Sequence, residues 1–150
     1  MRAHGGDLRR GRVSEAGRIY LVTTVVRDRR PIFADWRIGR QLVQVLRAAD
    51  AAGLSETLAF VVMPDHVHWL FGLGETAGLS ALMRVVKGQS SHRVALASGR
   101  HGLWQKGFHD HAARRDEDVQ AMARYVVANP LRVGLVKSLA DYPLWDAIYL

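Results

Sequence analysis

The feature that most constrains this chain is the stretch VVMPDHVHWLF, residues 61–71. Two apolar runs rich in β-branched and aromatic residues flank Pro64 and Asp65, and this pattern predicts a β-hairpin with a tight turn. Successive side chains alternate between the faces of a strand, so His66 and His68 share one face. Two imidazoles held side by side on rigid backbone can bind one divalent metal ion. The alternative is that both are polar residues on the solvated face of a half-buried sheet.

The bulk properties indicate a single globular domain with an anionic partner. A chain of 150 residues with 49% hydrophobic residues can bury one core. The formal charge of +7 favours a polyanion, most often nucleic acid, although an arginine-rich composition without such a partner is the alternative. Cysteine is absent, which excludes disulfides and thiolate chemistry, and there is no signal-peptide pattern. We therefore expect a cytoplasmic, nucleoid-associated protein.

The hydrophobic pattern predicts an α+β fold in the order β-α-β-β-α-β-α. Residues 1–17 contain several glycines and no apolar period, which predicts a flexible arm whose basic residues include Arg9, Arg10 and Arg12. A single domain follows over residues 18–150. Because strands alternate with helices and include a hairpin, the simplest arrangement is an antiparallel sheet with helices packed on it. The expected strands cover residues 18–27, 57–63, 66–73 and 103–113, and the expected helices cover 35–52, 79–97 and 116–129.

The last expected helix carries a tyrosine outside its buried stripe. At about 100° per residue, Tyr125 lies roughly 120° from the centre of that stripe. Asn129 follows one turn later on the same side, and Pro130 disfavours helical geometry there, so we expect the helix to end at Asn129. A late helix of an α+β fold can lie across the sheet and bring these two side chains over the two histidines. The alternative for Asn129 is a helix C-terminal residue before proline.

Two imidazole nitrogens and one amide oxygen suit Mg²⁺ or Mn²⁺ with open positions for substrate oxygens. A free tyrosine has a pKa of about 10 and is a weak nucleophile at neutral pH. A metal that polarises a scissile phosphate and stabilises the departing 3′-oxygen supplies what the tyrosine lacks. That chemistry yields a 5′-phosphotyrosine and a free 3′-hydroxyl, and strand rejoining stays open because the bond energy is conserved.

Three blocks of the sequence together resemble a known family. Residues 63–68 (MPDHVH) look like the metal-binding motif of the single-tyrosine HUH transposases. Residues 103–111 (LWQKGFHDH) and 124–136 (RYVVANPLRVGLV) resemble the REP-associated tyrosine transposases within that family. The blocks occur in the right order and at the right separation. With the first strand, the resemblance covers most of residues 18–137.

The resemblance implies a ferredoxin- or RRM-like sheet fold and metal-dependent cleavage of single-stranded DNA that bears hairpins. It makes Tyr125 the nucleophile. The implied ligands of Mg²⁺ or Mn²⁺ are His66, His68 and Asn129, the last at a position where many family members carry glutamine. The substrates would be repetitive extragenic palindromes (REP elements). The active unit would be either a monomer or a homodimer whose active sites combine two chains.

Several basic residues are candidates for binding DNA. They are Arg9, Arg10 and Arg12 in the arm, and Arg84, Lys87 and Arg93 on the helix over residues 79–97. A solvated basic face explains the helix set equally well. A second His-x-His pair, His109 and His111, ranks below the first as a metal site because Asp110 between them faces the side where an apolar residue is expected.

Two functions from other classes stay open. A small basic α+β domain can bind structured DNA or RNA without cutting it. A metal-dependent phosphodiesterase can use water in place of tyrosine. The first predicts no metal-dependent cleavage, and the second predicts cleavage that survives Tyr125→Phe without a covalent adduct.

Overall fold

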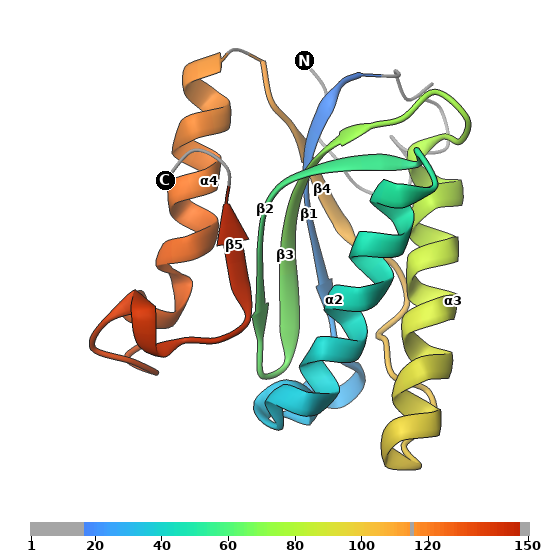
Figure 1. The fold of residues 1–150 in the computed structure, drawn as a ribbon, viewed down its shortest axis with the longest axis vertical. Helices are drawn as coiled ribbons and strands as arrows, with labels where there is room; N and C mark the ends of the chain where they lie inside the picture. The colour runs from blue at the N-terminus through green and yellow to red at the C-terminus, as the bar shows by residue number, and fades with distance from the viewer. Residues whose placement is uncertain (1–16, 115, 148–150) are drawn as a thin grey trace.

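The computed structural model describes residues 17–114 and 116–147, which form a five-stranded antiparallel sheet (Figure 1). The strands are β1 (Ile19–Val25), β2 (Ser55–Met63), β3 (His66–Leu73), β4 (His109–Ala112) and β5 (Trp145–Ala147). They lie in the order β4-β1-β3-β2-β5, so β3 is inserted between β1 and β2. Of the arm expected over residues 1–17, only Gly17 lies within the described residues, and Arg9, Arg10 and Arg12 lie outside them.

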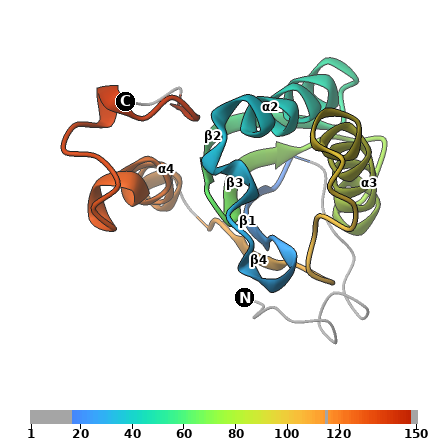
Figure 2. The ribbon, with the colours of Figure 1, turned by 90° about the horizontal axis from the view of Figure 1, so that it is seen from below.

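Helices cover both faces of the sheet. In Figure 2, α2 (Trp36–Ala51) and α3 (Leu79–Ser98) lie on one face, and α4 (Asp116–Arg132) lies on the other. Asp35 caps α2, because its carboxylate accepts a hydrogen bond of 3.0 Å from the backbone N–H of Arg37. The predicted α+β fold is confirmed, with β5 as an additional edge strand. Among the helices of the described residues, none combines the length and apolar character needed to cross a membrane.

Strand β3 is buried because β1 and β2 pair with its two edges and helices cover the two faces of the sheet. Val67 and Trp69 point into the core shared with α2 and α3. Leu70 belongs to the core beneath α4. Alternation along the strand puts His66 and His68 on the α4 side. The alternative of a solvated face is therefore wrong for His68, which is only 7% exposed, whereas His66 is half-buried.

The fourth strand is shorter than the sequence predicts. A strand is expected over residues 103–113, but β4 covers only His109–Ala112. Upstream of it, Trp104 joins the sheet through an isolated bridge, and Gly107 has a left-handed backbone with φ of 81°. The Lys87 ammonium of α3 donates a hydrogen bond of 2.7 Å to the carbonyl oxygen of Gly107. This segment is therefore held by a helix as well as by the sheet.

Helix α4 continues beyond its predicted end at Asn129 and finishes at Arg132. Pro130 has no N–H, so the carbonyl oxygen of Val126 lacks its usual donor four residues on. The side-chain amide of Asn129 donates to that oxygen at 3.1 Å, and to the carbonyl oxygen of Tyr125 at 2.9 Å. The predicted helix end is wrong because a side chain replaces the missing backbone donor.

The segment after α4 packs back on the sheet. Strand β5 pairs with β2 at the sheet edge. The carbonyl oxygen of Leu144 accepts a hydrogen bond of 2.9 Å from the N–H of Val62, and the hydroxyl of Tyr142 donates one of 2.5 Å to the carbonyl oxygen of Val62. This edge of the sheet is thereby covered beside α4.

Candidate active site

The two histidines of the β2–β3 hairpin lie near the centre of the sheet, beneath α4. In the strand register, His68 stands opposite Thr23 of β1 and Val61 of β2. The rings of His66 and His68 have centroids 4.8 Å apart and planes at 82°. The two imidazoles therefore face a common space, as their spacing predicts.

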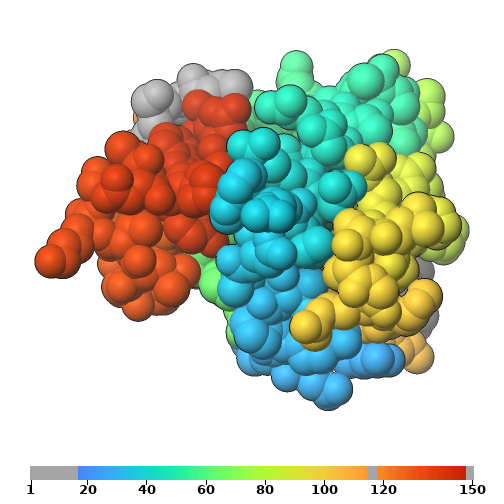
Figure 3. Space-filling model, turned by 60° about the horizontal axis from the view of Figure 1, so that its bottom comes forward, coloured from blue at the N-terminus to red at the C-terminus, as the bar shows by residue number. Residues whose placement is uncertain are grey.

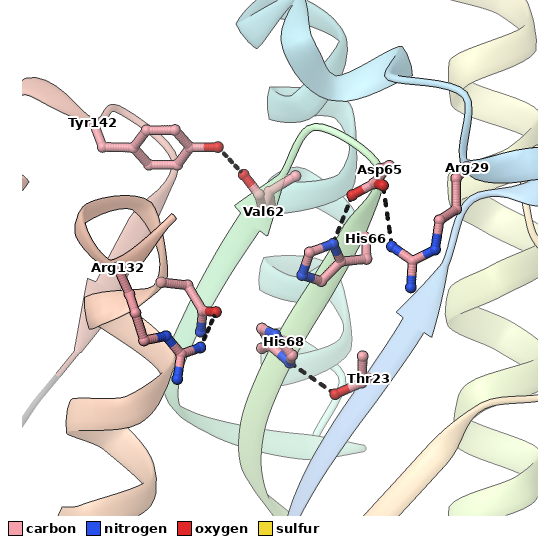
Figure 4. Close-up of polar contacts among 9 residues, drawn as sticks. Thr23, Arg29, Val62, Asp65, His66, His68, Arg132 and Tyr142 are labelled. Atoms are coloured by element: carbon pink, nitrogen blue, oxygen red, sulfur yellow. Dashed lines mark hydrogen bonds and ion pairs between the residues drawn. The ribbon is translucent and has the colours of Figure 1, made fainter. Parts of the chain in front are cut away.

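A hydroxyl on the neighbouring strand holds His68. Its Nδ1 atom lies 2.7 Å from Oγ1 of Thr23 (Figure 4). Burial, followed by the charges of His66 and Arg132, lowers the pKa of His68 from 6.5 to about 4. The ring is therefore neutral at pH 7, and neutral imidazole is the form that binds a metal ion.

A carboxylate in the preceding turn orients His66. The Nδ1 atom of His66 lies 2.7 Å from Oδ1 of Asp65, whose Oδ2 accepts a hydrogen bond of 3.1 Å from Arg29 (Figure 4). Burial raises the pKa of Asp65, but the hydrogen bonds and charges of His66 and Arg29 outweigh it and bring that pKa below its usual value of 3.8. These three side chains form a chain of contacts from the loop after β1 to the first imidazole.

Arg29 reaches Asp65 from a strained turn. It belongs to η1 (Arg27–Arg29), in which Asp28 and Arg29 have φ angles of 58° and 49°. A left-handed backbone at a residue other than glycine costs about 1–3 kcal/mol and persists only where the surrounding structure enforces it. Hydrogen bonds between this loop and the hairpin turn, including one of 2.8 Å from the N–H of Val26 to the carbonyl oxygen of Asp65, supply that support.

The two histidines fit a shared divalent metal ion. Because Asp65 and Thr23 each engage an Nδ1 atom, the Nε2 atom of each ring is left for a metal bond. A carboxylate or another polar partner on the far nitrogen is the usual support of a metal-binding histidine. Within the described part of the chain, no group of three or more His, Asp or Glu residues could hold an ion.

Tyr125 lies over this pair on the side of α4 that the sequence places outside the buried stripe. Its ring meets that of His68 edge to face, with centroids 5.6 Å apart and planes at 68°. Tyr125 is 43% exposed, whereas Ala123 and Val126 on the same helix are fully buried. The fold thus brings an accessible phenol to the first His-x-His pair, while its role as the nucleophile stays a prediction.

Asn129 lies one turn from Tyr125, but its amide is engaged. The residue is 3% exposed. Its Nδ2 donates to the carbonyl oxygens of Tyr125 and Val126, and its Oδ1 accepts a hydrogen bond of 2.6 Å from Arg132. This geometry supports a structural role at the end of the helix. The ligand role stays a prediction, and it requires Oδ1 to bind the metal alongside Arg132 or in its place.

Arg132 is the residue of this site that the sequence analysis misses. Its guanidinium carbon lies 4.5 Å from the centroid of the Tyr125 ring. Tyr125, Asn129 and Arg132 have the spacing i, i+4 and i+7, which places them on one face of a continuous helix. If the helix is assumed to end at Asn129, Arg132 falls outside it and its place on this face is missed. The i+7 spacing from Tyr125 is the sequence signal that could have identified it.

The basic residues predicted on α3 lie away from Tyr125, because α3 covers the opposite face of the sheet (Figure 2). Arg84 is exposed. Lys87 donates to the carbonyl oxygens of Gln105 and Gly107, and Arg93 donates a hydrogen bond of 3.1 Å to a side chain of α2. DNA contact by these residues stays a prediction.

The second His-x-His pair differs from the first. His109 and His111 are exposed on the edge strand β4. Asp110 between them is 3% exposed, so a carboxylate occupies the buried side. Strand β1 separates this pair from β3, and the two pairs therefore do not form one site.

The surface over the β2–β3 hairpin is hollowed. Figure 3 shows a recess between α4 with its following segment on one side and the segment after β1 on the other, with the green hairpin visible at its floor. In the close-up of Figure 4, Arg132 and Arg29 lie on opposite sides of the two histidines. An extended anionic chain in this recess would meet an arginine from each side.

Comparisons with known proteins point to a transposase family. The family described as "Transposase IS200 like" matches residues 16–129. The REP-associated tyrosine transposase of Escherichia coli K12 is 35% identical over 89 residues, which cover 59% of this chain and 52% of that protein. The chain spans about half the length of the curated relatives that it matches.

Solved structures agree with this assignment. A REP-associated tyrosine transposase bound to a REP hairpin matches with a TM-score of 0.73 at 27% identity, covering 97% of this chain and 82% of that one. A Deinococcus radiodurans R1 transposase structure matches with a TM-score of 0.56 at 20% identity, covering 86% of this chain and 97% of that one, and shares the fold alone. The resemblance of the sequence to REP-associated tyrosine transposases is thus confirmed. Because the family model matches residues 16–129, which is more than half of the chain, this chain belongs to the family of IS200-like transposases.

Proposed function

We propose that this chain cleaves and rejoins single-stranded DNA that bears REP-like hairpins, with Tyr125 as the nucleophile and a 5′-phosphotyrosine as the intermediate. The observation that carries the proposal is the edge-to-face contact of Tyr125 with His68, 5.6 Å between ring centroids. Tyr125 is 43% exposed, so a DNA strand can reach it. The solved relative bound to a REP hairpin supports hairpin DNA as the substrate class.

The chain's own residues supply orientation and the nucleophile. His66 and His68 would hold Mg²⁺ or Mn²⁺ through their Nε2 atoms, since Asp65 and Thr23 engage the Nδ1 atoms. When bound, the metal supplies polarisation of the scissile phosphate and stabilisation of the departing 3′-oxygen. The Oη atom of Tyr125 attacks phosphorus, so that the P–Oη bond forms and the P–O3′ bond breaks. The phenol releases one proton and the 3′-oxygen takes one up, and the reverse step rejoins a strand.

Two rival functions predict different outcomes for the same protein. A non-catalytic binding module would bind structured DNA or RNA without metal-dependent cleavage. A metal phosphodiesterase that uses water would cut DNA without a covalent adduct. Tyr125→Phe separates all three, because only the proposed function needs the phenol oxygen for cleavage.

The test is a denaturing gel of the protein mixed with labelled single-stranded hairpin DNA from beside its own gene, with and without Mn²⁺. The proposal expects a metal-dependent protein–DNA adduct that is absent in Tyr125→Phe. Tyr142→Phe is the matched control, since it removes a hydroxyl that bonds the backbone of β2 rather than facing the histidines, and it should keep the adduct. Cleavage without an adduct would favour hydrolysis by water. Binding without cleavage, across a panel of such hairpins, would favour the binding module.

A further inference from the structure

We propose that Arg132 forms a phosphate-binding site beside Tyr125 and contacts a nonbridging oxygen of the phosphodiester that the phenol attacks. This inference rests on the proposed function and deepens it by naming the protein group that receives the scissile phosphate. It is carried by the position of the guanidinium and by its unused donors.

The position of Arg132 depends on the unusual end of α4. Because the Asn129 side chain donates to the carbonyl oxygen that Pro130 leaves without a partner, the helix continues past Asn129 and ends at Arg132. Arg132 then lies two turns from Tyr125 on the same face. Its guanidinium carbon lies 4.5 Å from the centroid of the phenol ring, a distance typical of a cation–π contact.

The contacts of Arg132 leave most of its donors for an anion. A guanidinium has five N–H donors in one plane. Within the described residues it uses one of them, from Nη2 to Oδ1 of Asn129 at 2.6 Å, and no ion pair joins it to a described carboxylate. The planar fork of arginine matches the oxygens of a phosphate. Arg132 is therefore oriented by two neighbours without being neutralised by them.

The same guanidinium faces the space in which the phosphate would react. Figure 4 shows Arg132 on the α4 side of the site and His68 on the sheet side. A phosphodiester within bonding distance of the Tyr125 oxygen thus comes close to a positive charge that is fixed before the substrate arrives. Preorganised charge of this kind stabilises the extra negative charge of a phosphoryl-transfer transition state.

The first test combines an enzyme change with a substrate change. Under single-turnover conditions with Mn²⁺ and saturating hairpin DNA, Arg132→Gln should slow adduct formation by about 100-fold, the usual effect of removing one preorganised donor. Arg132→Lys should recover part of the rate because it keeps the charge and loses the fork. Lys137→Gln, which removes one exposed charge from the segment after α4, should stay within about twofold of the original rate.

A methylphosphonate at the cleaved position then separates a phosphate contact from a structural role. It removes the charge of one nonbridging oxygen, so it should slow adduct formation by the unaltered protein. If Arg132 contacts that phosphate, the methylphosphonate should reduce the rate of adduct formation much less in Arg132→Gln, because the guanidinium that pairs with the oxygen is already absent. If Arg132 only packs on Tyr125, the two losses should multiply, and that outcome overturns the inference.

A second measurement keeps this inference separate from the proposed function. In metal-free protein, the side-chain ¹⁵N–¹H resonances of Arg132 should shift when hairpin DNA is added, and the shift should persist in Tyr125→Phe and in Lys137→Gln. Failure to form an adduct would overturn the proposed function even where these resonances shift. Resonances that do not respond to bound DNA would overturn the phosphate site even where the adduct forms.

Discussion

The side-chain amide of Asn129 donates a hydrogen bond of 3.1 Å to the carbonyl oxygen of Val126, the acceptor that Pro130 leaves without its backbone donor. This contact connects the stability of α4 to the site, because it allows the helix to extend to Arg132. It also gives Asn129 a measurable structural role that is distinct from metal binding.

A double-mutant cycle tests that structural role. Asn129→Ala should lower the free energy of unfolding by about 1–3 kcal/mol in the native background, because the carbonyl oxygen of Val126 loses its donor. In a Pro130→Ala background, the backbone N–H of residue 130 is restored and donates to that oxygen. Asn129→Ala should therefore lower the free energy of unfolding by measurably less than in the native background. Urea unfolding of the four proteins measures the difference. Equal costs in the two backgrounds would contradict the structural role of the Asn129 amide.

Metal affinity in the same four proteins addresses the ligand role. If Asn129 is the third ligand, Asn129→Ala should weaken Mn²⁺ binding in both backgrounds, because replacing Pro130 restores a helix bond and not an oxygen ligand. If Asn129 acts only through the helix, the Mn²⁺ affinity should recover with stability in the double variant.

Asp65→Asn is predicted to weaken metal binding although it leaves both proposed histidine ligands in place. The carboxylate lies 2.7 Å from Nδ1 of His66 and orients that ring, and loss of such a partner commonly costs 10–100-fold in metal affinity. Electron paramagnetic resonance of free Mn²⁺ gives the dissociation constant directly. Asp146→Asn, an exposed carboxylate on β5, is the matched control and should leave the constant unchanged. An unaltered affinity in Asp65→Asn would show that Asp65 serves the turn alone.

Local rules predict the part of the site that rests on regular structure. The alternation of a strand places His66 and His68 on one face, and the helical period places Tyr125 outside the buried stripe of α4. Both expectations agree with the structure, in which Tyr125 and His68 are in ring contact. The hairpin bounds also agree closely, because turn residues separate two β-branched runs.

The parts that the sequence does not predict depend on contacts between distant segments. The rule that proline ends a helix fails because the Asn129 side chain supplies the missing donor, and the position of Arg132 follows from that exception. Strand β5 has three residues and too little periodicity to be detected, and it is placed by its pairing with β2. Thr23 and Asp65 are ordinary residues in sequence, and their role beside the imidazoles requires the strand register and the hairpin turn.

The pKa of His68 predicts an acid-dependent loss of stability in the metal-free protein. The folded-state pKa is about 4 against an unfolded value of 6.5, so the unfolded chain binds the extra proton between these values. Stability should therefore fall as the pH drops from about 6.5 towards 4, by about 3 kcal/mol at the conversion of 1.36 kcal/mol per pKa unit. Urea unfolding with EDTA from pH 7 to pH 4 measures this slope.

The control for this slope is His68→Gln, which keeps a polar group beside Thr23 and cannot titrate in that range. Its stability should depend much less on pH over the same interval. Asp65 does not contribute to this slope. Its pKa is lowered from 3.8 by folding, so protonation of Asp65 destabilises the folded protein only below about pH 3.8. The same slope in both proteins would show that another group causes the acid sensitivity.

The two basic residues Arg84 and Lys87 of α3 are predicted to behave differently although both were candidates for DNA contact. The ammonium of Lys87 donates to the carbonyl oxygens of Gln105 and Gly107 at 2.8 and 2.7 Å. Lys87→Met should therefore lower the free energy of unfolding by about 1.5–3 kcal/mol, the usual range for a hydrogen bond to a charged group. Arg84 is exposed, so Arg84→Gln should leave stability within about 0.5 kcal/mol.

The salt dependence of DNA binding then decides which of the two residues contacts phosphate. A residue that neutralises one phosphate contributes about one unit to the slope of log K against log salt concentration. If α3 touches DNA through its exposed face, Arg84→Gln should reduce the slope by about one unit, and Lys87→Met should leave it unchanged where the protein is still folded. The reverse pattern would mean that Lys87 exchanges its backbone partners for DNA. An unchanged slope in both variants would exclude these two residues of α3 from the interface, and the salt dependence would then have to come from elsewhere, for example from Arg132 and the recess beneath α4.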